Sequence, residues 1–435
     1  MNRRVTRRAA LAAAAAAWAL AAPVAHAQER PIAFAGATIH TMAGPTLENA
    51  TLVVARGKIV AVGADAAVPA EAERRDARGL VIMPGIVDTH SHIGQVAGAD
   101  NSSPIQPDVR ALDSINPRDT TIDKARAGGI TTVNVMPGSG FLMSGQTLYI
   151  KLRQGDSVDD IAFRFPDGSA MGGMKMANGT NPLRPVPGFP GTRAKSAALA
   201  RAAFIEAQTY CKGDRKKRDI GKDAMCEVLS GKRLVHFHTH RADDIMTAVR
   251  LAREFGFKML IQHGMESWKV AGELAAAGIP VSNILVDAPG GKLEAMGARL
   301  ETAGILERAG VLTSLHSDDG IVDSRLLLRE AGLAVRGGMT REGALKALTI
   351  NGAKQLGLDA RVGSLEPGKD ADFILLSGDP LSLFTQVRET WVEGTKVFDR
   401  STPEGKLMAE GGFGAGQPRE LAHYHWEAAD AEDIH

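Results

Sequence analysis

The sequence predicts an α/β protein, in which eight strand–helix units close into a (β/α)8 barrel and both chain ends build a small β-sandwich domain. Between residues 84 and 359, short β-like runs alternate with helical stretches, the pattern of a parallel sheet, and eight such units are typical of a barrel. Residues 32–83 and 371–398 carry further β-like runs, separated by turn signals such as Arg56-Gly57. Each outer block is too short to bury a core alone, so we expect the two blocks to pair.

The expected barrel strands are short, largely apolar runs, and most of them precede a helical pattern. They cover residues 85–92, 130–136, 160–165, 172–177, 233–240, 258–264, 279–286 and 311–320. The predicted domain boundaries are a signal peptide at 1–27, β-sandwich parts at 28–83 and 360–402, the barrel at 84–359, and a C-terminal tail at 403–435. The tail is glycine-rich and then acidic. We expect it to be poorly ordered or draped on the surface, without a metal-binding role for its histidines, His423, His425 and His435.

Composition excludes several classes of partner. The chain has 435 residues, of which 44% are hydrophobic and 23% charged, as in ordinary globular proteins. Its formal net charge of +1 gives no reason to expect nucleic acid as a partner. After the N-terminal segment, no stretch is apolar and long enough to span a membrane. We therefore expect a small-molecule substrate, and the sequence leaves a homo-oligomer open.

The N-terminal segment has the composition of a secretory signal peptide. A basic start and an alanine-rich apolar stretch precede Ala25-His26-Ala27, which predicts cleavage before Gln28 and a periplasmic or secreted protein. Residues 6–11 resemble a twin-arginine export signal, although Ala10 stands where that pattern prefers phenylalanine. In an oxidising compartment Cys211 and Cys226 could form a disulfide, and the alternative of two free thiols stays equally open.

Histidines gather where the predicted strands end. In the stretch PGIVDTHSHIG, His90 and His92 are two residues apart, so a strand would direct both imidazoles to one face, as a metal requires. Active sites of such barrels lie at the carboxyl ends of the strands. The other ionisable residues at these ends are Lys175, His236, His238, His240, His263, His316 and Asp318. Random scatter would not give this distribution, which predicts a metal centre.

Taken together, these motifs resemble the metal-dependent amidohydrolase superfamily. The resemblance rests on PGIVDTHSH, a lysine on the fourth strand, HxH on the fifth, QHG on the sixth, SD on the eighth, and the ending GSLEPGKDADFILLSGDP. It covers roughly residues 30 to 400 and is closest to the imidazolonepropionase-like and prolidase-like amidohydrolases.

The resemblance implies a centre with two divalent metal ions, for which zinc is expected although other ions suit the same ligands. His90, His92 and Asp318 would hold the more buried ion. A second ion would be held by His238 and His263, because HTHRADDI resembles the family pattern HAHxxxxI, whose first histidine is the ligand. Lys175 would carry a carbamate that bridges the ions, since an unmodified ammonium has no lone pair. Asp318 would act as the general acid and base.

Other polar residues lie near these motifs. We interpret His236 as a hydrogen-bonded core histidine, and expect His240 to lie further out, where it could contact substrate. His316 occupies a position that is often small in the superfamily. In the loops, Arg184 or Arg193 could pair with a substrate carboxylate, and Gln146 could contact substrate, although solvent-facing arginines are the simpler interpretation.

Three functions follow from this pattern. The first is a hydrolase with two metal ions that cleaves an amide-type C–N bond in a dipeptide, an N-acyl amino acid or a cyclic amide. The second is a deaminase with one metal ion, but Arg241 stands where such enzymes commonly carry an acid. The third is a barrel retained as a binding or scaffold protein, which missing ligands would favour; none is missing.

Overall fold

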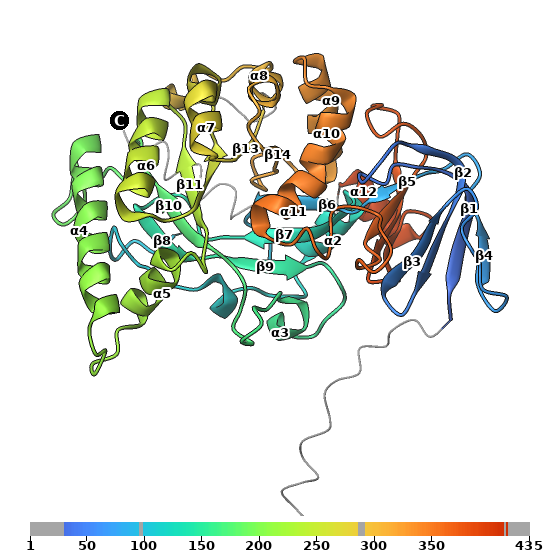
Figure 1. Cartoon of the computed structure of the whole chain (residues 1–435), viewed down its shortest axis with the longest axis horizontal. Helices are drawn as coiled ribbons and strands as arrows, with labels where there is room; N and C mark the ends of the chain where they lie inside the picture. The colour runs from blue at the N-terminus through green and yellow to red at the C-terminus, as the bar shows by residue number, and fades with distance from the viewer. Residues whose placement is uncertain (1–29, 95–98, 286–291, 413–414, 416–435) are drawn as a thin grey trace, which may run out of the picture.

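The structure, a computed structural model, describes residues 30–94, 99–285, 292–412 and 415. A strand-rich unit lies at one side of a larger unit whose strands are covered by helices (Figure 1). Among the described residues, no helix combines the length and apolar character that crossing a bilayer requires. The predicted signal peptide and the three tail histidines lie outside these residues.

Both chain ends contribute to one eight-stranded sheet, as the sequence predicted. Its strands are β1 (Ile32–Ile39), β2 (Leu47–Ala55), β3 (Lys58–Gly63), β4 (Glu73–Asp76), β5 (Val81–Pro84), β15 (Phe373–Leu376), β16 (Val387–Val392) and β17 (Thr395–Asp399). Their order is β17-β16-β15-β5-β1-β2-β3, with β4 beside β1. The two ends meet where β15 runs antiparallel to β5, with Phe373 opposite Pro84. A sandwich of two sheets is not shown for the described residues.

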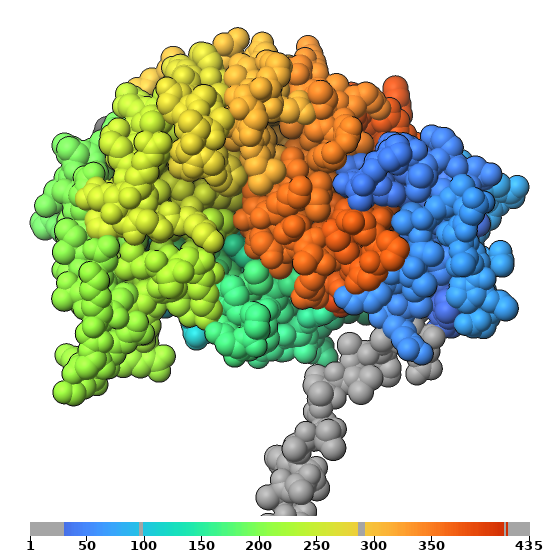
Figure 2. All heavy atoms as spheres, viewed as in Figure 1, coloured from blue at the N-terminus to red at the C-terminus, as the bar shows by residue number. Residues whose placement is uncertain are grey.

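The hairpin between β2 and β3 turns at Arg56 and Gly57, the pair singled out in the sequence. Both have a positive φ, of 50° and 74°, as a two-residue turn of type I′ requires. In Figure 2 the N-terminal residues, in blue, lie directly beside orange residues from the C-terminal part of the chain. Between these segments Phe34 packs edge-on against Phe373 and Trp391, with ring centroids 5.1 and 5.2 Å apart, so the shared core is aromatic.

In the described part of the chain, the larger unit has nine short, fully buried strands. They are β6 (Ile86–Ser91), β7 (Ile130–Val135), β8 (Met143–Gln146), β9 (Leu148–Lys151), β10 (Met174–Ala177), β11 (Val235–Thr239), β12 (Met259–His263), β13 (Val281–Asn283) and β14 (Thr313–Leu315). Strands β10 to β14 pair in parallel in chain order, and β6 pairs in parallel with β7. Seven of the eight predicted strands are therefore present, and their burial explains their continuous apolar runs.

The predicted strand at 160–165 is wrong. Its first two residues end a single helical turn, α3 (Val158–Ile161), which begins with a capping box of Ser157 and Asp160, with Asp160 Oδ2 accepting the Ser157 N–H at 2.8 Å. Beyond this turn, Ala162 and Arg164 make only isolated antiparallel bridges, to Ile150 and Ala170. The place of the third strand is taken by β9, which runs antiparallel to β7, and by β8, which runs antiparallel to β10. The expected uniform series of parallel strands is therefore interrupted here.

Strands β6 and β14 approach each other, but among the described residues no ladder joins them, so a closed barrel is not shown. The link is made just beyond the strand ends. The Asp318 N–H donates to the His90 carbonyl at 2.9 Å. The buried Asp88 carboxylate accepts the N–H of Ser317 at 3.1 Å and its hydroxyl. Side-chain and loop contacts thus tie the first strand of the unit to the last.

Helices connect and cover these strands (Figure 1). The α-helices are α2 (Thr120–Ala127), α4 (Arg193–Lys212), α5 (Ile220–Leu229), α6 (Ala242–Phe255), α7 (Ala271–Ala277), α8 (Thr302–Arg308), α9 (Leu327–Arg336), α10 (Arg341–Leu348), α11 (Ile350–Leu356) and α12 (Pro403–Glu410). Short 3-10 turns are η1 (Ala111–Asp113), η2 (Ser267–Val270), η3 (Leu293–Ala295) and η4 (Ser324–Leu326).

Two details settle or correct sequence expectations. Cys211 and Cys226 form a disulfide, which joins α4 to α5. The tail was predicted to be poorly ordered or surface-draped from residue 403, but its first part is helix α12. The Thr402 hydroxyl caps this helix by accepting the Gly405 N–H, and Pro403 stands at its first turn, where the missing N–H costs nothing.

Candidate metal centre

The predicted ligands stand at the ends of neighbouring strands. His90 lies in β6, Lys175 in β10, His238 in β11 and His263 at the end of β12, while Asp318 follows β14. Because β10 to β14 are parallel, their carboxyl ends meet at one edge, which is where sheets of this kind bind ligands. The structure thus brings side chains from distant parts of the sequence to one place.

His90, His92 and Asp318 form one compact group of ligand atoms. Asp318 Oδ1 lies 3.2 Å from His90 Nε2 and 3.0 Å from His92 Nε2, and the two Nε2 atoms are 3.3 Å apart. Two imidazoles and a carboxylate are the donors that zinc and similar ions prefer. The grouping is the one expected for the more buried ion.

Contacts at Nδ1 hold the rings of His90 and His92 so that their Nε2 atoms face Asp318. His92 Nδ1 donates to the Met136 carbonyl at 2.8 Å, since a carbonyl only accepts, so a neutral ring bound to a metal ion would present its lone pair on Nε2. His90 Nδ1 lies 3.2 Å from Gln262 Oε1. Such contacts fix the orientation and tautomer of metal-binding histidines.

His238 and His263 form the neighbouring group, with ring centroids 4.4 Å apart. Both ring nitrogens of His238, and Nε2 of His263, are buried and have no hydrogen-bond partner among the residues the structure describes. An unsatisfied buried polar atom costs about 1–3 kcal/mol, so three of them side by side are unusual in a protein core, where buried polar atoms are normally hydrogen-bonded. Each neutral imidazole has one nitrogen with a lone pair, so His238 and His263 can each direct one lone pair at a metal ion, and the residues therefore fit the implied second ion.

Lys175 lies beside the first group. Its side chain is fully buried, with Nζ 3.1 Å from His90 Nε2 and 3.0 Å from Met136 Sδ. Residue 175 pairs with His236 in the β10–β11 ladder, so its Cα lies one strand away from the fifth-strand histidines.

Two of the predicted ligands have a strained backbone. His263 and Asp318 have φ angles of 68° and 48°, in the left-handed region that costs a non-glycine residue of order 1–2 kcal/mol. Such conformations persist where the surroundings fix them, and they gather at functional sites. Here they turn the chain sharply at the ends of β12 and β14, directly at the cluster.

Burial dominates the electrostatics of the histidines. It lowers the pKa of His238 and His263 well below the ordinary value, and that of His240 and His316 to about 3, so these rings are neutral near pH 7. Burial also opposes ionisation of Asp318, but the contacts with the histidine rings outweigh it and hold the pKa of that carboxyl well below its usual range. Neutral imidazoles and an ionised carboxylate are the protonation states that bind metal ions.

The other strand-end histidines have distinct environments. The ring of His236 contacts the Tyr149 hydroxyl at 3.0 Å and the side-chain amides of Asn134 and Gln262, as expected for a core histidine. His316 lies behind the cluster, with Nε2 3.1 Å from His263 Nδ1 and Nδ1 2.7 Å from the Ser282 hydroxyl.

The predicted substrate contacts are engaged elsewhere in this structure. Arg184 donates to the carbonyls of Asn181 and Leu183 at 2.7 and 2.9 Å, and Gln146 donates to the Pro107 carbonyl at 2.9 Å. These contacts organise loops, and a direct contact of either side chain with substrate stays a prediction.

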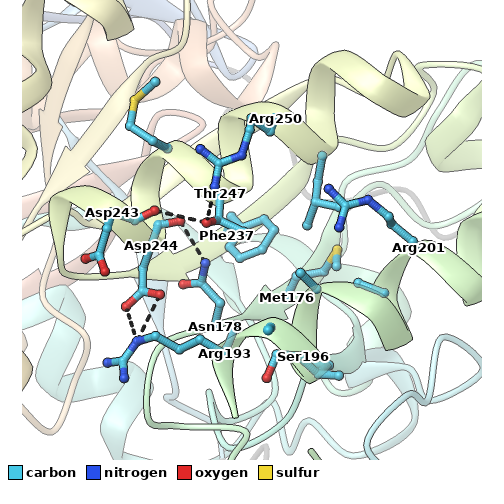
Figure 3. Close-up of a pocket in the computed structure, with 17 residues that line it drawn as sticks. Met176, Asn178, Arg193, Ser196, Arg201, Phe237, Asp243, Asp244, Thr247 and Arg250 are labelled. Atoms are coloured by element: carbon cyan, nitrogen blue, oxygen red, sulfur yellow. Dashed lines mark hydrogen bonds and ion pairs between the residues drawn. The ribbon is translucent and has the colours of Figure 1, made fainter.

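A cavity of about 440 Å³ between α4 and α6 is not the metal centre, because none of the ligands lines it. Figure 3 shows its charged side, where Arg193 donates to both oxygens of Asp244 at 2.9 and 3.1 Å. The sequence analysis proposed Arg193 as a substrate contact, but in this structure its guanidinium is paired with the carboxylate of Asp244.

Three residues of the site escaped the sequence analysis. Gln262, in the motif QHG, orients His90, and Asp88, in the motif PGIVDTHSH, holds Ser317 next to Asp318. Both stood inside recognised motifs and could have been proposed from their positions. Glu294 is different: it belongs to η3, beyond β13, and reaches His238 and His240 from a segment without any motif.

The amidohydrolase family model matches residues 229–403. A solved structure of an amidohydrolase from Thermotoga maritima is 35% identical, covers 85% of this chain and 100% of its own, and has a TM-score of 0.80. An imidazolonepropionase of Deinococcus deserti is 27% identical over 81% of this chain and 92% of its own length. Amidohydrolase tasK of Hapsidospora irregularis is 25% identical over 76% of this chain, which spans only 38% of that relative.

Proposed function

Because this chain belongs to the amidohydrolase family and is a hydrolase of carbon–nitrogen bonds, we propose that it cleaves an amide-type bond in a small substrate with two bound divalent metal ions. Dipeptides, N-acyl amino acids and cyclic amides are the substrate classes to be tested first. The observation that carries the proposal is the convergence of four buried histidines and Asp318, with nitrogens on His238 and His263 that have no hydrogen-bond partner among the described residues.

In this proposal His90, His92 and Asp318 hold one ion, and His238 and His263 hold the other. Lys175, if carbamylated, would add carboxylate oxygens to this set of ligands. When bound, such ions polarise the substrate carbonyl and make hydroxide available near neutral pH. Asp318 accepts the proton of the attacking water and returns it to the leaving amine, so that the amine departs neutral.

The surrounding residues keep the donors in place. The Met136 carbonyl and Gln262 fix the rings of His92 and His90. Asp88 holds Ser317, and the backbone N–H of Asp318 is bound to the His90 carbonyl, so the general base and its neighbouring ligand are fixed to each other. Pre-positioned groups of this kind avoid reorganisation during the reaction.

Elemental analysis of purified protein, combined with a screen of dipeptides and N-acyl amino acids on the zinc-loaded enzyme, tests this function. About two ions per chain and release of a free amine would support it. One ion per chain with release of ammonia would indicate a deaminase instead, and protein that binds no metal would overturn the proposal.

The same proposal includes export. Residues 1–27 have the features of a signal peptide, and the disulfide between Cys211 and Cys226 is of a kind that persists in oxidising compartments. A periplasmic or secreted location would account for both, and a twin-arginine route would allow the ions to be loaded before export.

A further inference from the structure

A second set of ligand atoms lies beside the proposed centre, at the end of β11. His238 and His240 come from that strand end, and Glu294 reaches them from η3. One ligand atom from each of the three residues lies within 4.8 Å of the others. All three residues are at least nine-tenths buried, with exposed fractions of 3, 5 and 5%.

These residues leave an unusual number of polar atoms unsatisfied. Both ring nitrogens of His240, both of His238, and Oε1 of Glu294 have no hydrogen-bond partner within the described parts of the chain. Each such atom costs about 1–3 kcal/mol when buried, and a charged group costs more. One nitrogen of each neutral imidazole and the Glu294 oxygen carry lone pairs, so three of these five atoms indicate a ligand that accepts lone pairs, and a cation is such a ligand.

The Glu294 carboxylate is built into its position. Its Oε2 atom accepts the N–H of Thr180 at 2.9 Å and lies 3.5 Å from Nη2 of Arg193. Gly179 makes this approach possible, because a Cβ atom there would lie 2.5 Å from Glu294 Oε2, and its φ of 72° also favours glycine. One oxygen is therefore held by the protein, and the other is left without a donor.

We propose that His238, His240 and Glu294 form an additional divalent-cation site, outward of the hydrolytic pair. Two imidazoles and one carboxylate suit zinc and related first-row ions. The proposal rests on the proposed function only in that His238 is common to both ligand sets. His238 would hold the outer ion through one ring nitrogen and the inner ion through the other, as an imidazolate whose proton has gone to solvent, so that the outer ion adds to the inner pair.

Counting bound zinc at a series of buffered free zinc concentrations tests the site. At zinc concentrations that saturate the wild type, Glu294→Gln and His240→Asn should each bind one ion fewer per chain, or bind the weakest ion at least about tenfold more weakly. Glu301→Gln, which removes an exposed carboxylate from the same connection, is the matched control and should bind as the wild type does. Cobalt absorption should lose the same component in both ligand variants.

A third variant, Gly179→Ala, leaves all three ligands in the chain but forces Glu294 away, and should weaken the same ion. Melting curves of each variant identify any that do not fold. Unchanged zinc counts in folded Glu294→Gln and His240→Asn would overturn the outer site and leave the hydrolytic pair intact. His263→Asn separates the two proposals, because it should reduce the inner pair and retain the outer ion.

Discussion

Lys175 Nζ lies 3.1 Å from His90 Nε2, on a side chain with no exposed surface. An ammonium in this position would be repelled and desolvated once two metal ions bound beside it. A carbamate on the same nitrogen would reverse the sign of the charge and supply two oxygen ligands, so in the proposed centre the chemical state of Lys175 would decide whether two ions can bind.

Lys175→Ala should therefore lose bound metal together with activity. High concentrations of a short carboxylic acid should restore part of the activity, because the acid can occupy the vacated bridge, whereas an amine of similar size should restore none. A crystal structure of the metal-loaded wild type checks the modification directly. Density that ends at the lysine amine, with both ions bridged by water alone, would contradict the carbamate and leave the other ligands standing.

Asp318→Asn should reduce turnover by a factor of at least about 100 while largely preserving the fold, as loss of a general acid–base group does. Asp319→Asn is the matched control, because Asp319 is directed at Lys124, with Nζ and Oδ1 3.0 Å apart, and not at the histidines. It should lower the melting temperature, because the buried ion pair with Lys124 is lost, and leave turnover close to that of the wild type. If Asp319→Asn were inactive and Asp318→Asn active, the assigned general base would be wrong by one residue.

The metal-free protein should lose stability in acid. Burial lowers the pKa of His236, His240 and His316 to about 3. Between about pH 6.5 and 3 these histidines are therefore protonated in the unfolded chain but not in the folded protein, so the free energy of unfolding falls as the pH falls. Burial raises the pKa of Asp88 to about 7, and this shift has the opposite effect on stability. The contribution of Asp88 to the free energy of unfolding is present at low pH and is lost as pH rises through about 7.

Between about pH 4 and 6.5 the three histidines outweigh the single carboxyl, and each net proton changes the free energy of unfolding by about 1.4 kcal/mol per pH unit. Melting temperatures of chelator-treated protein at pH 7.0 and 5.5 measure this. The melting temperature should fall toward pH 5.5. A flat or rising curve would show that the rings are protonated in the folded protein.

The mature protein should begin at Gln28 and be recovered outside the cytoplasm. The prediction follows from the basic start, the alanine-rich stretch and Ala25-His26-Ala27. N-terminal sequencing of protein from a periplasmic extract checks it, with a replacement of Arg7 and Arg8 by lysines to test the export route. Cytoplasmic protein that retains Met1 would contradict the prediction.

How far the sequence could predict the molecule depended on local signals. Strands β6, β7 and β10 to β14 have compact apolar runs followed by polar residues, and they were predicted at the correct places. At 160–165 the same kind of run misled the analysis, because the capping box of Ser157 with Asp160 favoured a helical turn. Tertiary pairing, which has no local signature, made β8 antiparallel to β10 and β9 antiparallel to β7.

For the site, residues that stand inside a motif could be predicted, and those that arrive from elsewhere could not. His90, His92 and Asp318 were named from their motifs, and the structure groups them within 3.3 Å. Glu294 follows no pattern, and only the fold brings it to His240. The contacts of Arg184 with its own loop depend on the path of the backbone, which residue type and spacing do not determine.

The pairing of β5 with β15 has a consequence for synthesis. Strand β5 leaves the ribosome early, but its partner Phe373–Leu376 emerges only after the whole larger unit. Until then one edge of β5 has no neighbour, and exposed edges recruit other chains. Contacts this distant in sequence also form slowly. Nascent chains should therefore depend on chaperones until residue 376 has emerged, and a chain truncated before β15 should aggregate rather than fold into a smaller protein.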